Sequence, residues 1–248
     1  MHHPARFAAP AVLVLALGIA ACGGDDPGPR KVASPSVLSK VPDATPDVEE
    51  TPTDQPSDQP SDQPSDQPSD QPTDEGDATT LVDYFAAEGI GQTALGPDDD
   101  GPVIDLPQPE GWSPSDDYSA EAPYGALVYD AATEPTDPPR VLALLVRIEG
   151  EADPGKILEL APGELEQLEH FTPNGPGTPS TLGAYDAVQV SGSYSNGGHE
   201  LVIAQKTVVI PDGDDLYVLQ LNAYAFPEEA DQLAVALRAI DASTTIQV

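Results

Sequence analysis

The chain has 248 residues, with 43 Asp and Glu against 9 Lys and Arg and a formal net charge of −34 at pH 7. Binding of nucleic acids requires a basic surface that neutralises phosphates, and this charge balance excludes it. One cysteine cannot build a disulfide scaffold, and one apolar N-terminal segment cannot build a bundle of membrane spans.

The first 21 residues have the pattern of an export signal. Arg6 is followed by an apolar run from Ala8 to Ala21, with small residues directly before Cys22. This order of charged, apolar and cleavage-site regions is typical of a signal peptide, and the run is too short for a stable spanning helix. We therefore expect a signal peptide over residues 1–21, cleavage between Ala21 and Cys22, and export of the chain.

Cys22 is placed to carry a lipid. The segment Ile19-Ala20-Ala21-Cys22 resembles a bacterial lipobox, in which the cysteine is diacylglyceryl-modified and becomes the first residue of the mature protein. A free thiol would be reactive outside the cell, whereas a thioether-linked lipid is not. Two acyl chains attach a protein firmly where one is reversible. We predict an anchor on Cys22; an ordinary signal peptide that happens to contain a cysteine is the alternative.

Residues 22–77 have the composition of a disordered tether. From Gly23 to Asp77 the segment holds 14 acids, 3 bases and 11 prolines, so it cannot bury enough apolar surface to offset the entropy of ordering. The tetrad Ser-Asp-Gln-Pro recurs four times from Ser57 to Pro72, a period far below that of stacked repeat folds. We expect a solvated spacer; O-glycosylation of its Ser and Thr residues is a second interpretation.

Residues 78–248 have a length that suits one domain with one core. They carry 29 acids and 5 bases, a net charge of 5 − 29 = −24. Such acidity keeps a domain soluble and repelled from anionic polymers, or reflects a salty habitat; recognition of a basic partner is the sharper alternative.

The predicted elements of this domain combine helices with strands. Thr80 caps a first helix that Gly89 ends, and turn signals after residues 195 and 211 predict a three-stranded antiparallel meander. In chain order we expect a helix over Thr80–Glu88, strands over Val103–Leu106 and Tyr124–Tyr129, a central strand over Val141–Ile148, a helical stretch from Pro154 that Pro162 divides, strands over Tyr185–Tyr194, Leu201–Ile210 and Leu216–Tyr224, a helix from Pro227 that buries Leu233, Ala236, Leu237 and Ile240, and a last strand over Thr244–Val248.

This pattern predicts an α+β fold with helices packed on an antiparallel sheet. The strands over Val141–Ile148 and Leu201–Ile210 are apolar on both faces, so each face of the sheet needs a cover of helices. We therefore expect a three-layer α/β/α sandwich with a mainly antiparallel central sheet.

Several segments downstream of the lipobox resemble the LpqN/LpqT lipoproteins of actinobacteria, over roughly Thr80 to Val248. The resemblance rests on Asp105 to Trp112, Tyr124 to Ala126, the Val141–Ile148 strand, Thr207 to Pro211 and Tyr217 to Leu221. It implies a Mog1/PsbP-like α/β/α sandwich and a non-enzymatic protein of the cell envelope, with roles beside mycolate-glycolipid transport or in contact with other proteins. It supplies no catalytic motif.

No set of residues predicts an enzyme. His170 and His199 are the only imidazoles of the mature chain, and no nucleophile elbow accompanies either. Acid clusters on the loops around Asp98–Gly101 and Asp212–Asp215 could attract calcium, but they lack the ligand spacing of an EF-hand. We expect no catalytic residues, no cofactor and no metal, and calcium at the loops remains the alternative.

Two functions stay open. The first is a lipoprotein on the outer face of the cell membrane that binds an envelope lipid or glycolipid or passes it to a transporter. The second is a surface module that docks on another envelope protein without a small ligand. Trp112, Tyr124 and Tyr129 either fill the core or line a cavity. We expect a monomer that contacts the membrane through Cys22, with ligand-binding residues unassigned.

Overall fold

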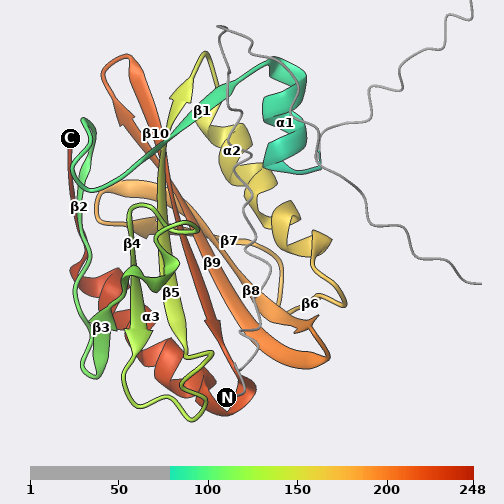
Figure 1. Cartoon of the computed structure of the whole chain (residues 1–248). Helices are drawn as coiled ribbons and strands as arrows, with labels where there is room; N and C mark the ends of the chain where they lie inside the picture. Colours follow the sequence, from blue (N-terminus) through green and yellow to red (C-terminus); the bar gives the residue numbers. More distant parts are fainter. Residues whose placement is uncertain (1–78) are drawn as a thin grey trace, which may run out of the picture. The chain divides into compact units, whose positions relative to one another are not determined.

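A computed structural model describes residues 79–248, drawn in colour in Figure 1. The predicted signal peptide, Cys22 and the tether lie outside the described residues. The elements are α1 (Leu81–Glu88), β1 (Gly91–Leu95), β2 (Val103–Asp105), β3 (Trp112–Pro114), η1 (Asp116–Tyr118), β4 (Gly125–Tyr129), β5 (Arg140–Glu149), α2 (Pro154–Leu160), η2 (Ala161–Gln167), β6 (Thr172–Pro173), β7 (Thr178–Leu182), β8 (Tyr185–Asn196), β9 (His199–Asp212), β10 (Asp215–Ala225), η3 (Pro227–Glu229), α3 (Ala230–Ser243) and β11 (Thr245–Gln247).

The domain is α+β and is built on a nine-stranded antiparallel sheet. Its strands follow the order β3-β4-β5-β10-β9-β8-β6, with β1 also paired to β5 and β7 also paired to β8. The predicted central strand is β5, and its side chains are buried on both faces from Arg140 to Val146. The strands β2 and β11 form a separate two-stranded sheet.

The predicted meander is confirmed as β8, β9 and β10, but each turn lies one residue later than the Asn-Gly and Asp-Gly signals indicate. The first turn is centred on Gly197 and Gly198, both with positive φ (58° and 84°). The second is centred on Gly213, φ 61°, and Asp214. Glycine adopts positive φ without a steric cost, so the two glycines take the strained positions and Asn196 stays in the strand.

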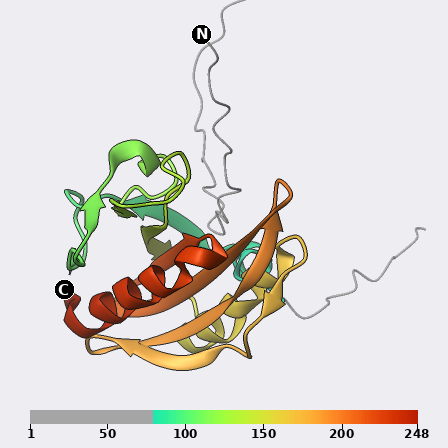
Figure 2. The same cartoon turned by 90° about the horizontal axis from the view of Figure 1, so that it is seen from below.

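Helices lie on both faces of the sheet (Figure 2). Alternate residues of each strand point to opposite faces. We call the side packed against α3 the α3 face, and the side packed against α1, α2 and η2 the α2 face. On β10, Leu219 and Leu221 belong to the core of the α3 face, whereas Val218 and Tyr224 belong to the α2 face.

The helix ends follow the predicted signals. The Thr80 hydroxyl accepts a hydrogen bond from Asp83 N at 3.1 Å, and Gly89 ends α1 with φ 65°. Pro162 divides the second helical stretch, as expected, into α2 and the 3-10 helix η2. The chain after Pro227 differs in detail, because a 3-10 turn precedes α3, which begins at Ala230. No helix in the described part of the chain is long and apolar enough to cross a membrane.

Candidate functional site

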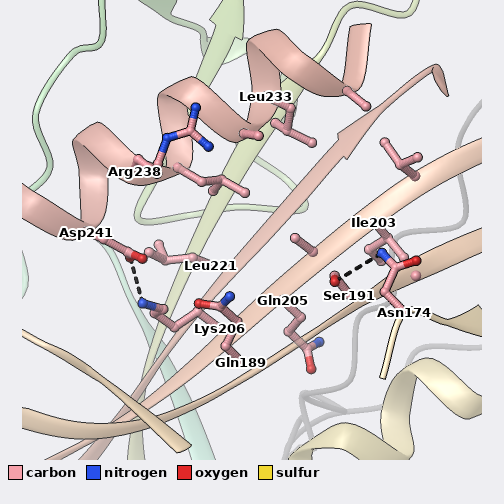
Figure 3. Close-up of a pocket in the computed structure, with 16 residues that line it drawn as sticks. Asn174, Gln189, Ser191, Ile203, Gln205, Lys206, Leu221, Leu233, Arg238 and Asp241 are labelled. Carbon is pink, nitrogen blue, oxygen red and sulfur yellow. Dashed lines mark hydrogen bonds and ion pairs between the residues drawn. The ribbon is translucent and has the colours of Figure 1, made fainter. Parts of the chain in front are cut away.

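A cavity of about 330 Å³ lies between α3 and the strands β8, β9 and β10 (Figure 3). Its volume falls at the small end of the range of about 300–1,000 Å³ typical of small-molecule sites. Its apolar wall consists of Val202, Ala204 and Leu221 from the strands and Ala230, Leu233, Ala234 and Leu237 from α3. The wall therefore offers apolar surface to a bound molecule.

Small side chains on both walls leave this space unfilled. The register places Ser191 of β8 beside Ala204 of β9, and Ala204 beside Ala223 of β10. Across from this shallow floor, α3 presents Ala230 and Ala234. Ala204 is only half-buried although it sits in the middle of a strand under a helix. The cavity is therefore open to solvent, and an apolar guest could enter without unfolding the core.

Polar groups stand at the two ends of the cavity. At one end, Lys206 Nζ lies 2.7 Å from Asp241 Oδ1 and donates to the Thr181 carbonyl at 3.3 Å. At the other end, Asn174 Nδ2 donates to Ser191 Oγ at 3.2 Å (Figure 3). An apolar chamber with polar ends matches the shape of an amphiphile.

The cavity is lined by two of the five basic residues of the domain. Lys206 and Arg238 line the cavity, and the only acid among its lining residues is Asp241. The Lys206 side chain is 8% exposed, whereas Arg238 is exposed on α3, one helical turn before Asp241. The site is thus locally basic on a strongly acidic domain.

The three aromatic residues that the sequence places either in the core or in a cavity, Trp112, Tyr124 and Tyr129, belong to the core. Trp112 and Tyr124 are 2% and 7% exposed and pack with the apolar residues of the α3 face. The Tyr124 hydroxyl accepts from Ile104 N at 2.7 Å, and Tyr129 packs on Trp112 with ring centres 5.7 Å apart. None of the three lines the cavity beside α3. Their role is to fill space.

The two histidines and the acid-rich loops that the sequence singles out do not assemble into a reactive group among the described residues. His170 and His199 are both exposed, and His199 contacts Phe226 with ring centres 6.1 Å apart. Over residues 79–248, no three His, Cys, Asp or Glu side chains converge in a way that could hold a metal ion. The acid-rich loops at Asp98–Gly101 and Asp212–Asp215 thus lack a preformed ligand cage.

The α2 face holds a second polar region, which we call the polar row: Gln205, Thr207, Gln220 and Asn222. The register puts Gln220 opposite Thr207 and Asn222 opposite Gln205, and all four are at most 1% exposed. Asn222 accepts from Gln205 Nε2 at 3.0 Å and donates to Gln220 Oε1 at 3.1 Å. Among the described residues, Gln205 Oε1, Thr207 Oγ1 and Gln220 Nε2 find no partner.

Arg140 extends this buried polarity along the α2 face. Its Nη1 lies 2.6 Å from Asp137 Oδ1, and its guanidinium carbon lies 5.4 Å and 5.0 Å from the ring centres of Tyr118 and Tyr224. Burial raises the pKa of Tyr194 to about 12, an effect that nearby Arg140 opposes. The Tyr194 phenol therefore stays protonated at neutral pH.

Glu164 joins η2 to the start of α1. Its Oε1 accepts from Leu81 N at 2.7 Å and from Val82 N at 3.2 Å. Burial, opposed by these two hydrogen bonds and reinforced by Asp83, raises the pKa of Glu164 to about 7. Because it caps a helix and does not face the cavity, Glu164 is a structural group.

Reasoning from the sequence alone finds the buried side of α3 but misses the cavity. Leu233 and Leu237 are predicted as core residues, and both prove to line it. One signal was available: Ala230 and Ala234 lie on the same side of α3 as these leucines. Lys206 and Arg238 carry a second signal, since bases are rare in this domain and both stand beside apolar residues of packed elements.

Comparison with known proteins agrees with this architecture. Residues 77–247 match the family model Lpp-LpqN, described as "Probable lipoprotein LpqN", and residues 44–77 match a model described as a PT disordered repeat. The chain is 44% identical over 168 residues to Lipoprotein LpqN of Mycobacterium tuberculosis, covering 67% of this chain and 73% of that one.

A solved structure extends the similarity to three dimensions. The crystal structure of LpqN, described as involved in cell envelope biogenesis of Mycobacterium tuberculosis, matches with a TM-score of 0.66 and 42% identity. The match covers 70% of this chain and the whole of the crystallised one. Sequence and structure thus agree on one assignment: the chain belongs to the LpqN family of lipoproteins.

Proposed function

We propose that this protein is an exported lipoprotein, anchored to the outer face of the cell membrane through a lipid on Cys22, whose domain binds an amphipathic envelope molecule without chemical conversion. In this proposal residues 1–21 are the signal peptide, residues 22–77 are the tether and residues 78–248 are the binding domain. Bound cargo is handed on as an accessory step in transport or envelope biogenesis, the process named for the LpqN crystal structure.

The observation that carries this function is the cavity beneath α3. It joins an apolar wall to polar groups at each end, and its floor residues Val202 and Ala204 remain half-buried. A folded domain gains about 25 cal/mol for each Å² of apolar surface removed from water. An apolar chain that covers this wall therefore stabilises both itself and the protein.

The arrangement of helices on both faces also supports an α/β/α sandwich of the Mog1/PsbP type. In such a fold the sheet is shielded on both sides. A gap under one helix is then a place where a ligand can bind without exposing the rest of the core.

A cavity-filling substitution tests this function. In Ala234→Phe, an aromatic ring occupies the space between α3 and β9, whereas Val235→Phe adds the same ring at a neighbouring position that is 58% exposed. Binding is measured by titrating the full chain with the fluorescent apolar probe N-phenyl-1-naphthylamine. We expect Ala234→Phe to reduce probe affinity by about tenfold or more, equivalent to about 1.4 kcal/mol, and Val235→Phe to leave it unchanged.

Two results would argue against the proposal. If the wild-type chain does not bind the probe at all, the cavity does not take apolar guests, and the alternative of a protein-docking module without a small ligand gains support. If both variants lose affinity equally, the probe binds elsewhere on α3.

A further inference from the structure

The two sides of α3 that face the sheet are supported differently. On one side, Leu233, Ala236 and Ile240 are at most 3% exposed and belong to the core of the α3 face. On the other side, Ala234 and Leu237 line the cavity and are only half-buried. Because helix residues spaced by three or four share one side, each set forms a continuous stripe. The helix is therefore packed against the core along one stripe and stands over open space along the other.

An ion pair ends the stripe over the cavity. Asp241 follows Leu237 by four residues, so it lies on the same side of α3. Its Oδ1 lies 2.7 Å from Nζ of Lys206 on β9, and the same ammonium donates to the carbonyl of Thr181 on β7 at 3.3 Å. The pair therefore ties the unpacked side of α3 to two strands of the sheet (Figure 3).

The two partners differ in their access to water. The Lys206 side chain is 8% exposed and that of Asp241 is 40% exposed. A buried ammonium has given up most of its hydration and depends on its hydrogen-bond partners. When the half-exposed carboxylate moves outward it regains water, and Lys206 keeps the Thr181 carbonyl as a partner. The pair therefore holds α3 in place, yet it can open without leaving either charge buried and unpartnered.

Both ends of α3 are fixed by other contacts. Before its first residue, Glu229 is 4% exposed and its Oε1 accepts from Thr133 N at 2.7 Å. After its last turn, Thr245–Gln247 form β11, which pairs with β2. A movement of α3 that keeps these contacts is a roll about its packed stripe, which lifts Leu237 and Asp241 away from the strands.

We propose that Lys206 is a positioning residue for the cavity: through Asp241 it holds the unpacked side of α3 against the sheet, and opening of this pair lets α3 roll outward so that a guest is exchanged. This inference rests on the proposed binding function and adds how access to the cavity is controlled. The half-buried Ala204 marks where the cavity already meets solvent, and the roll widens that opening. The ion pair therefore sets the rate of exchange.

The first test measures how fast a guest leaves. The full chain carries Cys22→Ser, so that no attached acyl chain competes for the cavity, and it is loaded with N-phenyl-1-naphthylamine. Release is followed by stopped-flow fluorescence after mixing with excess β-cyclodextrin, which traps the free probe. Hydrogen bonds to charged groups are among the stronger ones, and the exposure of Asp241 weakens this one. We expect Asp241→Ala to release the probe about tenfold faster than the wild type.

A double-mutant cycle assigns the effect to the pair. Lys206→Met keeps the apolar stem without the charge and should also speed release. Because the two residues act through one contact, the double variant should release the probe no faster than the faster single variant. Asp241→Glu keeps the carboxylate and should restore most of the wild-type rate. Glu159→Gln is the matched control: it breaks the exposed Lys156–Glu159 pair on the other face of the sheet and should leave the rate unchanged.

A second test follows α3 without a guest. Cys22 is the only cysteine, so in the Cys22→Ser chain a single new thiol under the helix, Ala204→Cys, reports access to the cavity. Asp241→Ala should speed its reaction with N-ethylmaleimide by about tenfold. A thiol at the exposed Val235 should react equally fast with and without Asp241→Ala. A thiol at Ala143, which is 1% exposed, should stay protected, because the roll does not unfold the core.

The outcomes separate the two proposals. Release and labelling rates that Asp241→Ala leaves unchanged, or additive effects in the cycle, overturn the positioning role of Lys206 while the binding function stands. Labelling of Ala204→Cys that rises only together with that of Ala143→Cys reports global unfolding and overturns it as well. If the wild-type chain binds no probe, the binding function fails together with the guest exchange inferred from it.

Discussion

The α3 face and the α2 face are built from alternate residues of the same strands, yet they place their polar groups differently. On the α3 face, Lys206 and Asp241 stand at the end of a cavity that is open to solvent. On the α2 face, the polar row lies at the centre of the sheet, sealed under α2 and η2. Polar groups near an opening can meet water or a ligand, whereas sealed ones depend on each other.

This difference assigns the two faces of the sheet different roles, one in binding and one in stability. Under the proposed function, the α3 face exchanges its guest without loss of internal hydrogen bonds. The α2 face gains nothing from solvent, and each polar atom that loses its partner there costs about 1–3 kcal/mol. We therefore expect substitutions on the α3 face to reduce ligand affinity, and substitutions on the α2 face to change the free energy of unfolding.

The largest effect is expected from Asn222→Leu. Asn222 is the shared partner of Gln205 and Gln220, and its loss leaves two further buried polar groups without a hydrogen bond. We expect the free energy of unfolding in urea to fall by about 3 kcal/mol. Leu219→Met, on the same strand but facing α3, conserves volume and should cost less than about 1.5 kcal/mol. A larger loss in the methionine variant would contradict the role given to the polar row.

An effect of similar size, which appears only at high pH, is expected from Glu164→Gln. The folded-state pKa of Glu164 is about 7, against an ordinary value of 4.5. Between these values the folded chain keeps a proton that the unfolded chain releases, so the contribution of this group to stability is lost as pH rises from 4.5 through 7. The glutamine still offers an oxygen to Leu81 N and Val82 N but cannot ionise.

Glu164→Gln should therefore match the wild type at pH 4 and exceed its unfolding free energy by about 3 kcal/mol at pH 8. Urea unfolding at the two pH values measures this gap. Glu166→Gln makes the same charge change at an exposed position two residues away and should show no comparable gap. A constant difference between Glu164→Gln and wild type at both pH values would show that the carboxyl is not titrating in this window.

The smallest change in stability is expected when either of two buried threonines is replaced by valine, which has nearly the same shape. Thr207 Oγ1, in the polar row, has no partner among the described residues. Thr244 Oγ1, at the end of α3, donates to the Ile240 carbonyl at 2.7 Å. Thr207→Val should raise the free energy of unfolding by about 1 kcal/mol, and Thr244→Val should lower it by a similar amount. The melting temperatures of the two variants should shift in opposite directions. If Thr207→Val instead lowers stability, a bound water satisfies that hydroxyl.

The sequence predicts the long elements of the fold and the short strands β2 and β11, but it misses four other short strands. Helix caps at Thr80, the meander and the doubly buried β5 follow from local chemistry, because capping, turn residues and apolar runs are local signals. The strands β1, β3, β6 and β7 have no such signal: β1, for example, leaves four of its five residues half-buried. It forms because β5 is long enough to pair with β4 and β1 in succession.

The cavity could be predicted only in part, for a similar reason. Apolar periodicity places Leu233 and Leu237 on the inner side of α3, but the empty space depends on how Ala230 and Ala234 meet Ala204 across a long-range contact. The polar row was equally hidden, since Gln205 and Asn222 interrupt strands that read as apolar. Only the register brings these two side chains together.

The central claim, that the α3 face carries an amphiphile, is tested most directly by native mass spectrometry of the protein purified from the envelope of its own host. The account predicts a discrete adduct that disappears on organic extraction, is absent from Ala234→Phe and is present in Val235→Phe. A bare mass in all three preparations, also after incubation with envelope lipid extract, would contradict it.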